Sequence, residues 1–209
     1  MHCSRLPAVV GEMGHVGRAA TQDDLDVIGS CLASAFADDP LWGLWSFPDP
    51  QRRSECLQPF MRFFGACGMR HPWLRMTAGG EAVTVWTLPG EVYVTQDEEL
   101  ELEALVDRLF SERAPALHAL FEQFDENLPE GDYYHLEWWA THRDHAGRGL
   151  GSALLHEDLA RIDAEHMPSY LESTNPANLS RYERLGFQPT GEFGPPGGPV
   201  ITAMWREAR

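Results

Sequence analysis

The chain of 209 residues is long enough for one ordinary domain, and its content of 43% hydrophobic and 23% charged residues is typical of a globular protein. Its 16 basic residues, all arginine, stand against 32 acidic ones, and a net charge of −16 argues against nucleic acid or an anionic membrane as partner. One interpretation of this negative charge is that it keeps the protein soluble. The alternative is that it attracts a cationic substrate. Apolar runs are too short for a membrane span or, at residues 6–10, for a signal peptide, so we expect a cytoplasmic protein.

The cysteines are scattered as Cys3, Cys31, Cys56 and Cys67, with no C-x-x-C pair and no histidine at zinc-finger spacing. We therefore expect reduced, buried thiols and no disulfide framework. The histidines form no convincing ligand pattern either, so we expect no metal site.

Helical and strand patterns alternate along the chain without a change of composition, which predicts a single α/β domain over residues 1–209. Residues 1–13 are expected to be a loose N-terminal segment. A capping box at residues 21–24 begins a helix that continues to residue 37. Apolar spacing predicts further helices at residues 50–68, 96–113, 115–127, 150–164 and 176–185, and strands at residues 16–20, 73–77, 82–88, 133–141, 169–172, 187–193 and 199–205.

Residues 142–152, HRDHAGRGLGS, join a predicted strand to a predicted helix. Glycines at alternate positions let the backbone approach a ligand, and the helix N-terminus favours an anion. Arg143 and Arg148 add positive charge. The spacing is G-x-G-x-G rather than the dinucleotide pattern, and without any lysine a P-loop is impossible, so a nucleotide-binding module is disfavoured. A tight turn that binds nothing remains the alternative.

Residues 171–187, LESTNPANLSRYERLGF, specify a second helix with clear boundaries. Asn175 is a good N-cap, Pro176 suits the first helical position, and Gly186 suits the C-terminal stop. Asn178 and Tyr182 are four residues apart and share one helix face. An amide and a phenol side by side could bind a ligand, and the alternative is that they pack into the core.

Together, HAGRGLGSALL and the later NxxNLxxYERLGF resemble the GNAT superfamily of acetyl-CoA-dependent N-acetyltransferases, over residues 136–187. Residues 35–40, residues 82–87 and the helices before the central strand are similar to the puromycin N-acetyltransferase-like branch. The resemblance implies the GNAT fold, a twisted mixed sheet of about six or seven strands flanked by helices, with extra helices inserted before the central strand.

The resemblance also implies acetyl-CoA as cosubstrate, without a metal, and a role for each matching residue. Asn178 contacts the cofactor, and Tyr182 protonates the departing CoA thiolate. Many relatives carry Gln or Arg where this chain has Ala146, so one side-chain donor to phosphate is missing. The pantetheine arm would pair with Trp139, Ala140 and Thr141, and the pyrophosphate would lie on Arg143, Ala146, Gly147, Arg148, Gly149, Leu150, Gly151 and Ser152.

A general base is harder to assign. Strand alternation predicts that His135, Glu137, Trp139 and Thr141 share one face. Aromatic neighbours could raise the pKa of Glu137, which makes it the candidate base, acting through water. An ion-paired strand residue is the alternative, and an amine that is already neutral needs no base.

Phe36, Trp42 and Trp45 follow or end the first helix, where relatives of this fold build the acceptor pocket, with Asp38 and Asp39 nearby. Core packing is the alternative for these aromatic residues. The expected function is transfer of an acetyl group to the amine of a small molecule by direct attack, in a monomer or homodimer. A longer acyl-CoA donor, or a CoA-binding sensor without catalysis, are the alternatives.

Overall fold

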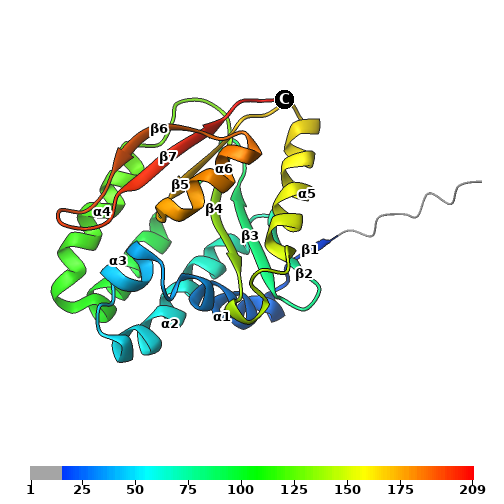
Figure 1. Ribbon diagram of the computed structural model, residues 1–209. Coiled ribbons are helices and arrows are strands. Elements are labelled where there is room, and N and C mark those ends of the chain that lie inside the picture. Colours follow the sequence, from blue (N-terminus) through cyan, green and yellow to red (C-terminus); the bar gives the residue numbers. More distant parts are fainter. Residues whose placement is uncertain (1–15) are drawn as a thin grey trace, which may run out of the picture.

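The structure is a computed structural model that describes residues 16–209; the loose segment expected at residues 1–13, with Cys3, lies outside the described residues. Over the described range, seven strands form one sheet in the order β1-β2-β3-β4-β5-β7-β6, with helices on both faces (Figure 1). The predicted mixed sheet flanked by helices is therefore confirmed. The strands are β1 (Gly17–Ala19), β2 (Leu74–Thr77), β3 (Ala82–Thr87), β4 (Tyr134–Thr141), β5 (Ser169–Ser173), β6 (Gln188–Phe193) and β7 (Ile201–Arg206).

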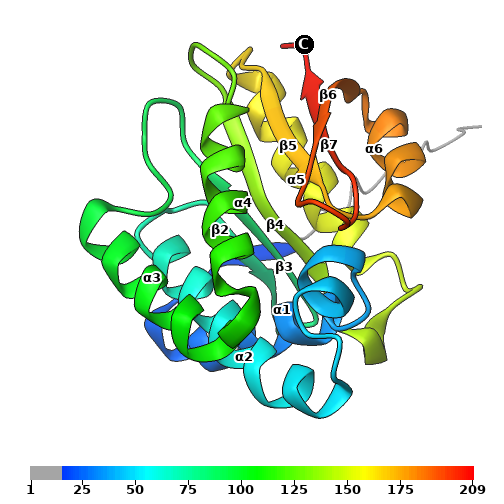
Figure 2. The same cartoon turned by 90° about the vertical axis from the view of Figure 1, so that its left-hand side faces the viewer.

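Four helices cover one face of the sheet and two lie on the other. The first group shares one apolar core and comprises α1 (Leu25–Phe36), α2 (Pro50–Gly68), α3 (Gln96–Phe110) and α4 (Ala114–Glu126). Helices α3 and α4 are the predicted insertion between β3 and β4, and they lie in front of the sheet in Figure 2. The second group packs on a separate core and comprises α5 (Leu150–Ala164) and α6 (Leu179–Leu185).

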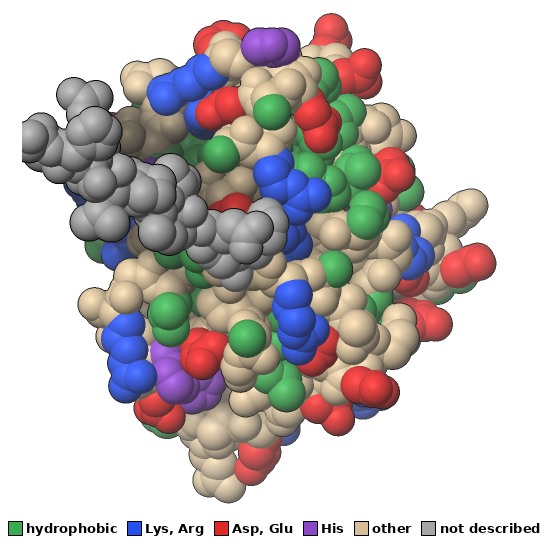
Figure 3. Space-filling model, turned by 90° about the vertical axis from the view of Figure 1, so that its right-hand side faces the viewer, with side chains coloured by type: hydrophobic (Ala, Val, Ile, Leu, Met, Phe, Trp, Pro, Cys, Tyr) green, Lys and Arg blue, Asp and Glu red, His purple; other side chains and the backbone are tan. Residues whose placement is uncertain are grey.

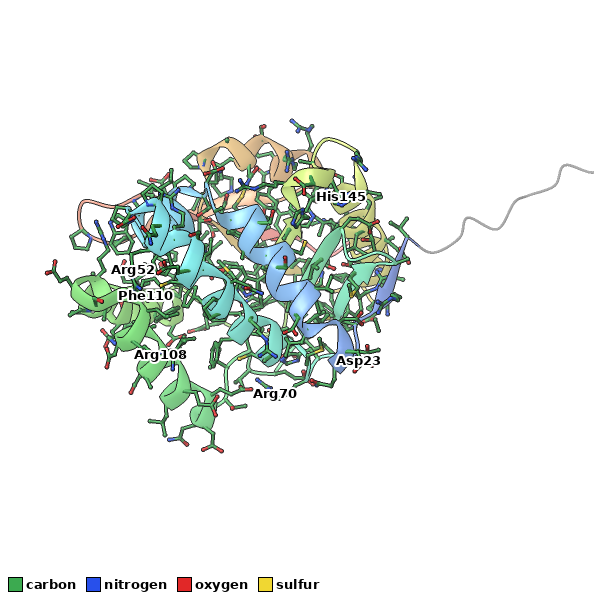
Figure 4. The ribbon with its side chains drawn as sticks, turned by 90° about the horizontal axis from the view of Figure 1, so that it is seen from below. Asp23, Arg52, Arg70, Arg108, Phe110 and His145 are labelled. Atoms are coloured by element: carbon green, nitrogen blue, oxygen red, sulfur yellow. The ribbon has the colours of Figure 1, made fainter. Side chains whose placement is uncertain are left out.

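The inserted helices are tied to α2 at both of its ends (Figure 4). Near the start of α2, Arg52 Nη2 donates to the carbonyl oxygen of Leu109 over 3.1 Å. Beyond its end, Arg70 Nη2 lies 2.7 Å from Glu98 Oε2. Between these points Phe110 fills the interface, with its ring centroid 4.9 Å from that of Phe60. The insertion is thus held on α2 by polar contacts around an aromatic centre.

Strand β4 carries a bulge at Glu137. Val85 of β3 pairs with Trp138 and the next residue, Trp86, pairs with Leu136, so Glu137 has no partner on β3. An extra residue reverses the side-chain alternation beyond it. Leu136 accordingly packs in the core with α5, whereas Trp138 packs in the core with α1 to α4.

The bulge overturns one expectation from the sequence. Trp139 and Thr141 face α5, where Trp139 Nε1 donates to the carbonyl oxygen of Gly151 over 2.9 Å. His135 and Glu137 lie instead on the side of α3 and α4, where both line a cavity. The prediction that these four side chains share one face is therefore wrong, because strict alternation ends at the bulge.

A buried ion pair fastens α5 to the sheet. Arg75 of β2, with 5% of its side chain exposed, bonds to Asp158 of α5, which is fully buried. Asp158 Oδ2 also accepts hydrogen bonds from Thr84 Oγ1 at 2.6 Å and Trp86 Nε1 at 3.1 Å. Both oxygens of the Asp158 carboxylate are therefore hydrogen-bonded, and Arg75 Nη2 also lies 2.9 Å from Glu157 Oε1. The outer surface on this side carries basic and acidic side chains intermingled (Figure 3).

Cys31, Cys56 and Cys67 are free and buried. Burial raises the pKa of the Cys31 and Cys67 thiols to about 12, which makes both poor nucleophiles. Among the described residues we find no group of side chains arranged to hold a metal ion and no helix that could span a membrane.

Candidate active site

The central feature of the site is a split between β4 and β5. The two strands pair in parallel at Tyr134 with Ser169 and His135 with Tyr170, and then separate. A cavity of about 570 Å³ opens in the gap, reaching from the β5 end to the N-terminus of α5. We call it the first cavity. The backbone of β4 from residue 136 onward therefore has no strand partner on the β5 side.

The glycine-rich loop forms one end of the first cavity. Gly147 and Gly149 adopt left-handed backbone conformations, with φ of +78° and +77°, and a Cβ at either position would meet open space. Glycine is therefore required there for its conformation, not for lack of room. Helix α5 begins directly after, at Leu150. The backbone N–H groups of residues 147–152 donate no hydrogen bond to any described residue. They suit an anion at the helix N-terminus.

At Gly151, glycine is required because there is no room for a side chain. A Cβ there would collide with Thr141 Oγ1 and would lie 3.0 Å from Trp139 Nε1. The first turn of α5 thus touches the end of β4 without a side chain between them. This close approach brings the loop amides and the unpaired β4 backbone to one surface.

Most residues predicted to bind the cofactor meet in the first cavity. Its lining includes Trp139, Ala140, Thr141, Ala146, Gly147, Gly149, Leu150, Gly151, Ser152 and Asn178, together with Tyr182 and Glu137. Two predicted residues do not reach it. The Arg143 guanidinium bonds to the carbonyl oxygen of Ser34 at 3.3 Å, and Arg148 Nη2 bonds to that of Asp144 at 3.2 Å.

Sequence reasoning missed Arg181, which does line the first cavity. Its guanidinium carbon lies 5.3 Å from the ring centroid of Trp139. Its place one helical turn after Asn178 was the available signal, because residues three apart share a face. Its guanidinium brings a positive charge to the first cavity, which the side chains of Arg143 and Arg148 do not line.

Tyr182 presents a free phenol to the first cavity. The helix end is as predicted: Gly186 has φ of +99°, and the Phe187 ring lies 6.0 Å from that of Tyr182. On its other side the Tyr182 ring meets Trp139 edge-to-face at 5.6 Å. The hydroxyl makes no hydrogen bond to any described residue. Burial raises the pKa of the phenol, so it is protonated at neutral pH.

Asp39 positions the aromatic wall of the site. Its Oδ1 accepts from the backbone N–H of Trp42 at 3.0 Å, and its Oδ2 accepts from Thr174 Oγ1 at 2.9 Å. The segment Pro40–Trp45 is thereby joined to the end of β5. Trp42 and Phe36, which the sequence predicts for an acceptor wall, line the first cavity. Trp45 lines neither this cavity nor the next, and lies 5.0 Å from the Arg113 guanidinium instead.

A second cavity of about 800 Å³ lies on the other side of the split, beneath α3, α4 and residues 87–94. The two cavities share five lining residues, Trp42, Glu137, Trp138, Glu172 and Thr174. They therefore meet where β4 and β5 separate. A ligand in the first cavity and another in the second would face each other there.

A buried imidazole bridges two carboxylates at this junction. His135 Nδ1 lies 3.1 Å from Glu137 Oε1, and His135 Nε2 lies 2.7 Å from Glu172 Oε2. Burial opposes a charge on His135, but the two carboxylates outweigh it and hold its pKa well above the usual range. Thr87 Oγ1 also donates to Glu137 Oε1 at 2.6 Å. Glu172, missed by sequence reasoning, keeps its Oε1 without any hydrogen-bond partner among the described residues.

Comparison with known proteins agrees with this geometry. Residues 104–189 match the family model of the acetyltransferase (GNAT) domain. A solved structure described as histone acetyltransferase HPA2 and related acetyltransferase, from Corynebacterium glutamicum, is 25% identical, with 93% of this chain and 96% of that chain covered and a TM-score of 0.63. Arylalkylamine N-acetyltransferase 2 from Aedes aegypti is 14% identical, with 92% and 98% covered and a TM-score of 0.56.

The fold is therefore that of the GNAT acetyltransferases, as the resemblance implied, and it extends over nearly the whole chain. The match over residues 104–189 includes the inserted α4, the split strands and both motifs. Together these findings support acetyl transfer as the general activity, with acetyl-CoA as the donor that such domains use.

Proposed function

We propose that this protein transfers an acetyl group from acetyl-CoA to the amine of a small molecule by direct attack. One observation carries the proposal: the split between β4 and β5 joins a cradle of unpaired amides, a free buried phenol and a second cavity open to an acceptor. The likeness of residues 35–40 and 82–87 to the puromycin N-acetyltransferase-like branch is compatible with a small amine as acceptor.

The residues of the first cavity fit acetyl-CoA on physical grounds. The amides of residues 147–152 and the start of α5 suit a pyrophosphate, and Arg181 adds a cation beside them. The β4 backbone at Trp139, Ala140 and Thr141 offers strand-like pairing to an extended amide arm, with Asn178 opposite. When bound, the thioester supplies an activated acetyl group. A β4 backbone N–H in the split would stabilise negative charge on its carbonyl oxygen.

Two protons must move during the transfer. A bond forms between the amine nitrogen and the acetyl carbon, and the carbon–sulfur bond breaks. The nitrogen loses one proton, for which Glu137 is the candidate acceptor through water, since it lines both cavities. The departing thiolate gains one, for which the Tyr182 hydroxyl is the candidate donor because it is protonated and free.

The first test is calorimetric titration with acetyl-CoA, with NAD and ATP as controls, followed by an assay of thiol release with amines. Selective binding of acetyl-CoA with thiol release is expected. Binding without release from any amine would leave a non-catalytic CoA sensor, and faster release from a longer acyl-CoA would change the donor.

Tyr182→Phe tests the proposed acid. We expect acetyl-CoA affinity to stay within about twofold while kcat falls by about 100-fold or more, as for loss of a general acid. Tyr134→Phe is a matched control, because Tyr134 is also buried, lines neither cavity and bonds to Glu165. An unchanged kcat for Tyr182→Phe removes this residue as the acid. Glu137→Gln tests the proposed base, and it should lower kcat/KM by about 100-fold, as for loss of a general base.

A further inference from the structure

We propose that the second cavity selects an acceptor with two positive charges: the reacting amine and a second cationic group, separated by an apolar or aromatic body. The inference rests on the proposed function and names the substrate class of the same site. Three features of the cavity carry it, at its deep end, its mouth and its walls.

At the deep end, one carboxylate oxygen of the junction makes no hydrogen bond to any described residue, and the neighbouring Tyr170 hydroxyl donates to the carbonyl oxygen of Asn127 over 3.2 Å. Glu172 has 6% of its side chain exposed, yet its Oε1 has no hydrogen-bond partner among the described residues. A buried carboxylate oxygen without a donor is costly. With His135 protonated, the two carboxylates around it leave one negative charge uncompensated. A primary ammonium brings one positive charge and three donors, which matches both deficits. The ammonium would then sit where the two cavities meet, and it must first release one proton to water, because only the neutral amine attacks the thioester.

At the mouth, carboxylates gather without partners. Glu99 and Glu103 of α3 and Glu122 and Asp125 of α4 line the cavity, and none of them forms an ion pair within residues 16–209. Burial and the neighbouring Glu99 raise the pKa of Asp125, so these like charges oppose each other. Their helices carry other acids that are paired, as Glu98 is with Arg70 and Asp107 with His118.

No arginine lines the second cavity in the described chain, and the sequence has no lysine. Of its two histidines, His118 is held by Asp107 and His135 by Glu137 and Glu172. An anionic acceptor would therefore find no unpaired cationic side chain among the described residues that line the second cavity. A second cation on the acceptor would relieve the repulsion at the mouth.

The walls between these two ends are aromatic. Trp42 stacks on Phe124 with ring centroids 6.0 Å apart and on Phe121 at 6.2 Å, and Phe64 and Tyr93 stack at 6.1 Å. All five line the second cavity. Its volume of about 800 Å³ is in the range that holds drug-sized ligands. An aromatic or long apolar body would fill the walls while its two ends reach the two acidic groups.

The test measures binding without turnover. Protein saturated with CoA is titrated calorimetrically with 1,4-bis(aminomethyl)benzene and with benzylamine, which share the same ring. We expect the diamine to bind about tenfold more tightly, as for two or three partly screened charge contacts, and to lose most of this advantage in high salt. Equal affinities would overturn the inference.

Two double variants test whether the tighter binding of the diamine depends on the carboxylates of the cavity. Glu103→Gln with Glu122→Gln removes two cavity carboxylates, whereas Glu101→Gln with Glu126→Gln makes the same charge change on exposed positions of the same helices outside the lining. The advantage of the diamine should fall to about threefold or less only in the cavity variant. An equal loss in both would assign the effect to net charge and refute the site. Absence of thiol release would count against the proposed function alone, because these measurements need no turnover.

Discussion

The two cavities on either side of the β4–β5 split are built in different ways. The first takes its polarity mainly from backbone amides of one loop and one helix start, residues 147–152. The second takes its polarity from side chains of β4, β5, α3 and α4, which lie far apart in the sequence. A site made of backbone needs a particular local chain conformation, whereas a site made of side chains can change with each substitution in an inserted helix.

The two cavities also differ in sign. Unpaired N–H groups and Arg181 favour an anion in the first, and unpaired carboxylates favour a cation in the second. The carboxylates of Glu137 and Glu172 line both cavities, so the two environments meet at this junction, and an anionic cofactor would be repelled from the acidic second cavity. The separation of β4 from β5 therefore divides two electrostatic environments as well as two volumes.

The largest expected effect concerns the support of the first cavity. Asp158→Ala would remove the fully buried carboxylate that Arg75, Thr84 and Trp86 share and would leave Arg75 only its ion pair with Glu157 at 2.9 Å, so the free energy of unfolding should fall by about 3 kcal/mol. Urea unfolding measures it, with Asp26→Ala as control. Asp26 pairs with Arg62 at 2.7 Å on the surface, with 79% of its side chain exposed, so its loss should cost at most about 1 kcal/mol. Similar losses in the two variants would mean that the buried pair does not fasten α5.

A smaller effect concerns the junction on the acceptor side. The folded state holds the pKa of His135 above its unfolded value of about 6.5. Its charged form therefore stabilises the fold fully below about pH 6.5, and that stability is lost as pH rises towards the folded pKa. The stability gap between the wild type and His135→Gln should shrink by up to about 1.4 kcal/mol per pH unit above 6.5. A gap that stays constant from pH 6 to pH 9 would contradict a charged imidazole between Glu137 and Glu172.

The sequence predicted most of the fold because its elements carry local signals. Every predicted helix and strand is present in the described chain, and the bounds agree to within three residues. Much of the lining of the first cavity was predictable for the same reason: positive φ at Gly147 and Gly149 and the helix stop at Gly186 are local requirements. The misassigned strand face shows the limit, because the bulge at Glu137 arises from pairing with β3 and has no local signature in the sequence.

The acceptor side was predictable only in part. Of the aromatic residues predicted for the acceptor wall, Trp42 lines the second cavity and Phe36 lines only the first. Trp45 lines neither, because the Pro40–Trp45 turn directs neighbouring aromatic residues to different surroundings. Glu172 could not be predicted as a site residue, because a single acidic residue in a short strand has no distinctive sequence pattern. Its exposure to the site depends on the separation of β4 from β5. Side chains that come together only through tertiary packing have no regular spacing in the sequence from which their contact could be predicted.

The smallest expected effect sharpens the electrostatic contrast. Arg181→Ala should weaken acetyl-CoA binding about fivefold, because one partly screened contact with an anion is worth about 1 kcal/mol. Arg148→Ala should change the affinity by less than about twofold, since the Arg148 side chain lies outside the lining and bonds to the carbonyl oxygen of Asp144. Calorimetry at low and high salt measures both, and salt should shrink only the effect at Arg181. An equal loss at Arg148 would instead place an anionic part of the cofactor over the loop. The positive potential would then extend beyond the first cavity, and the boundary between the two electrostatic environments would no longer coincide with the split strand.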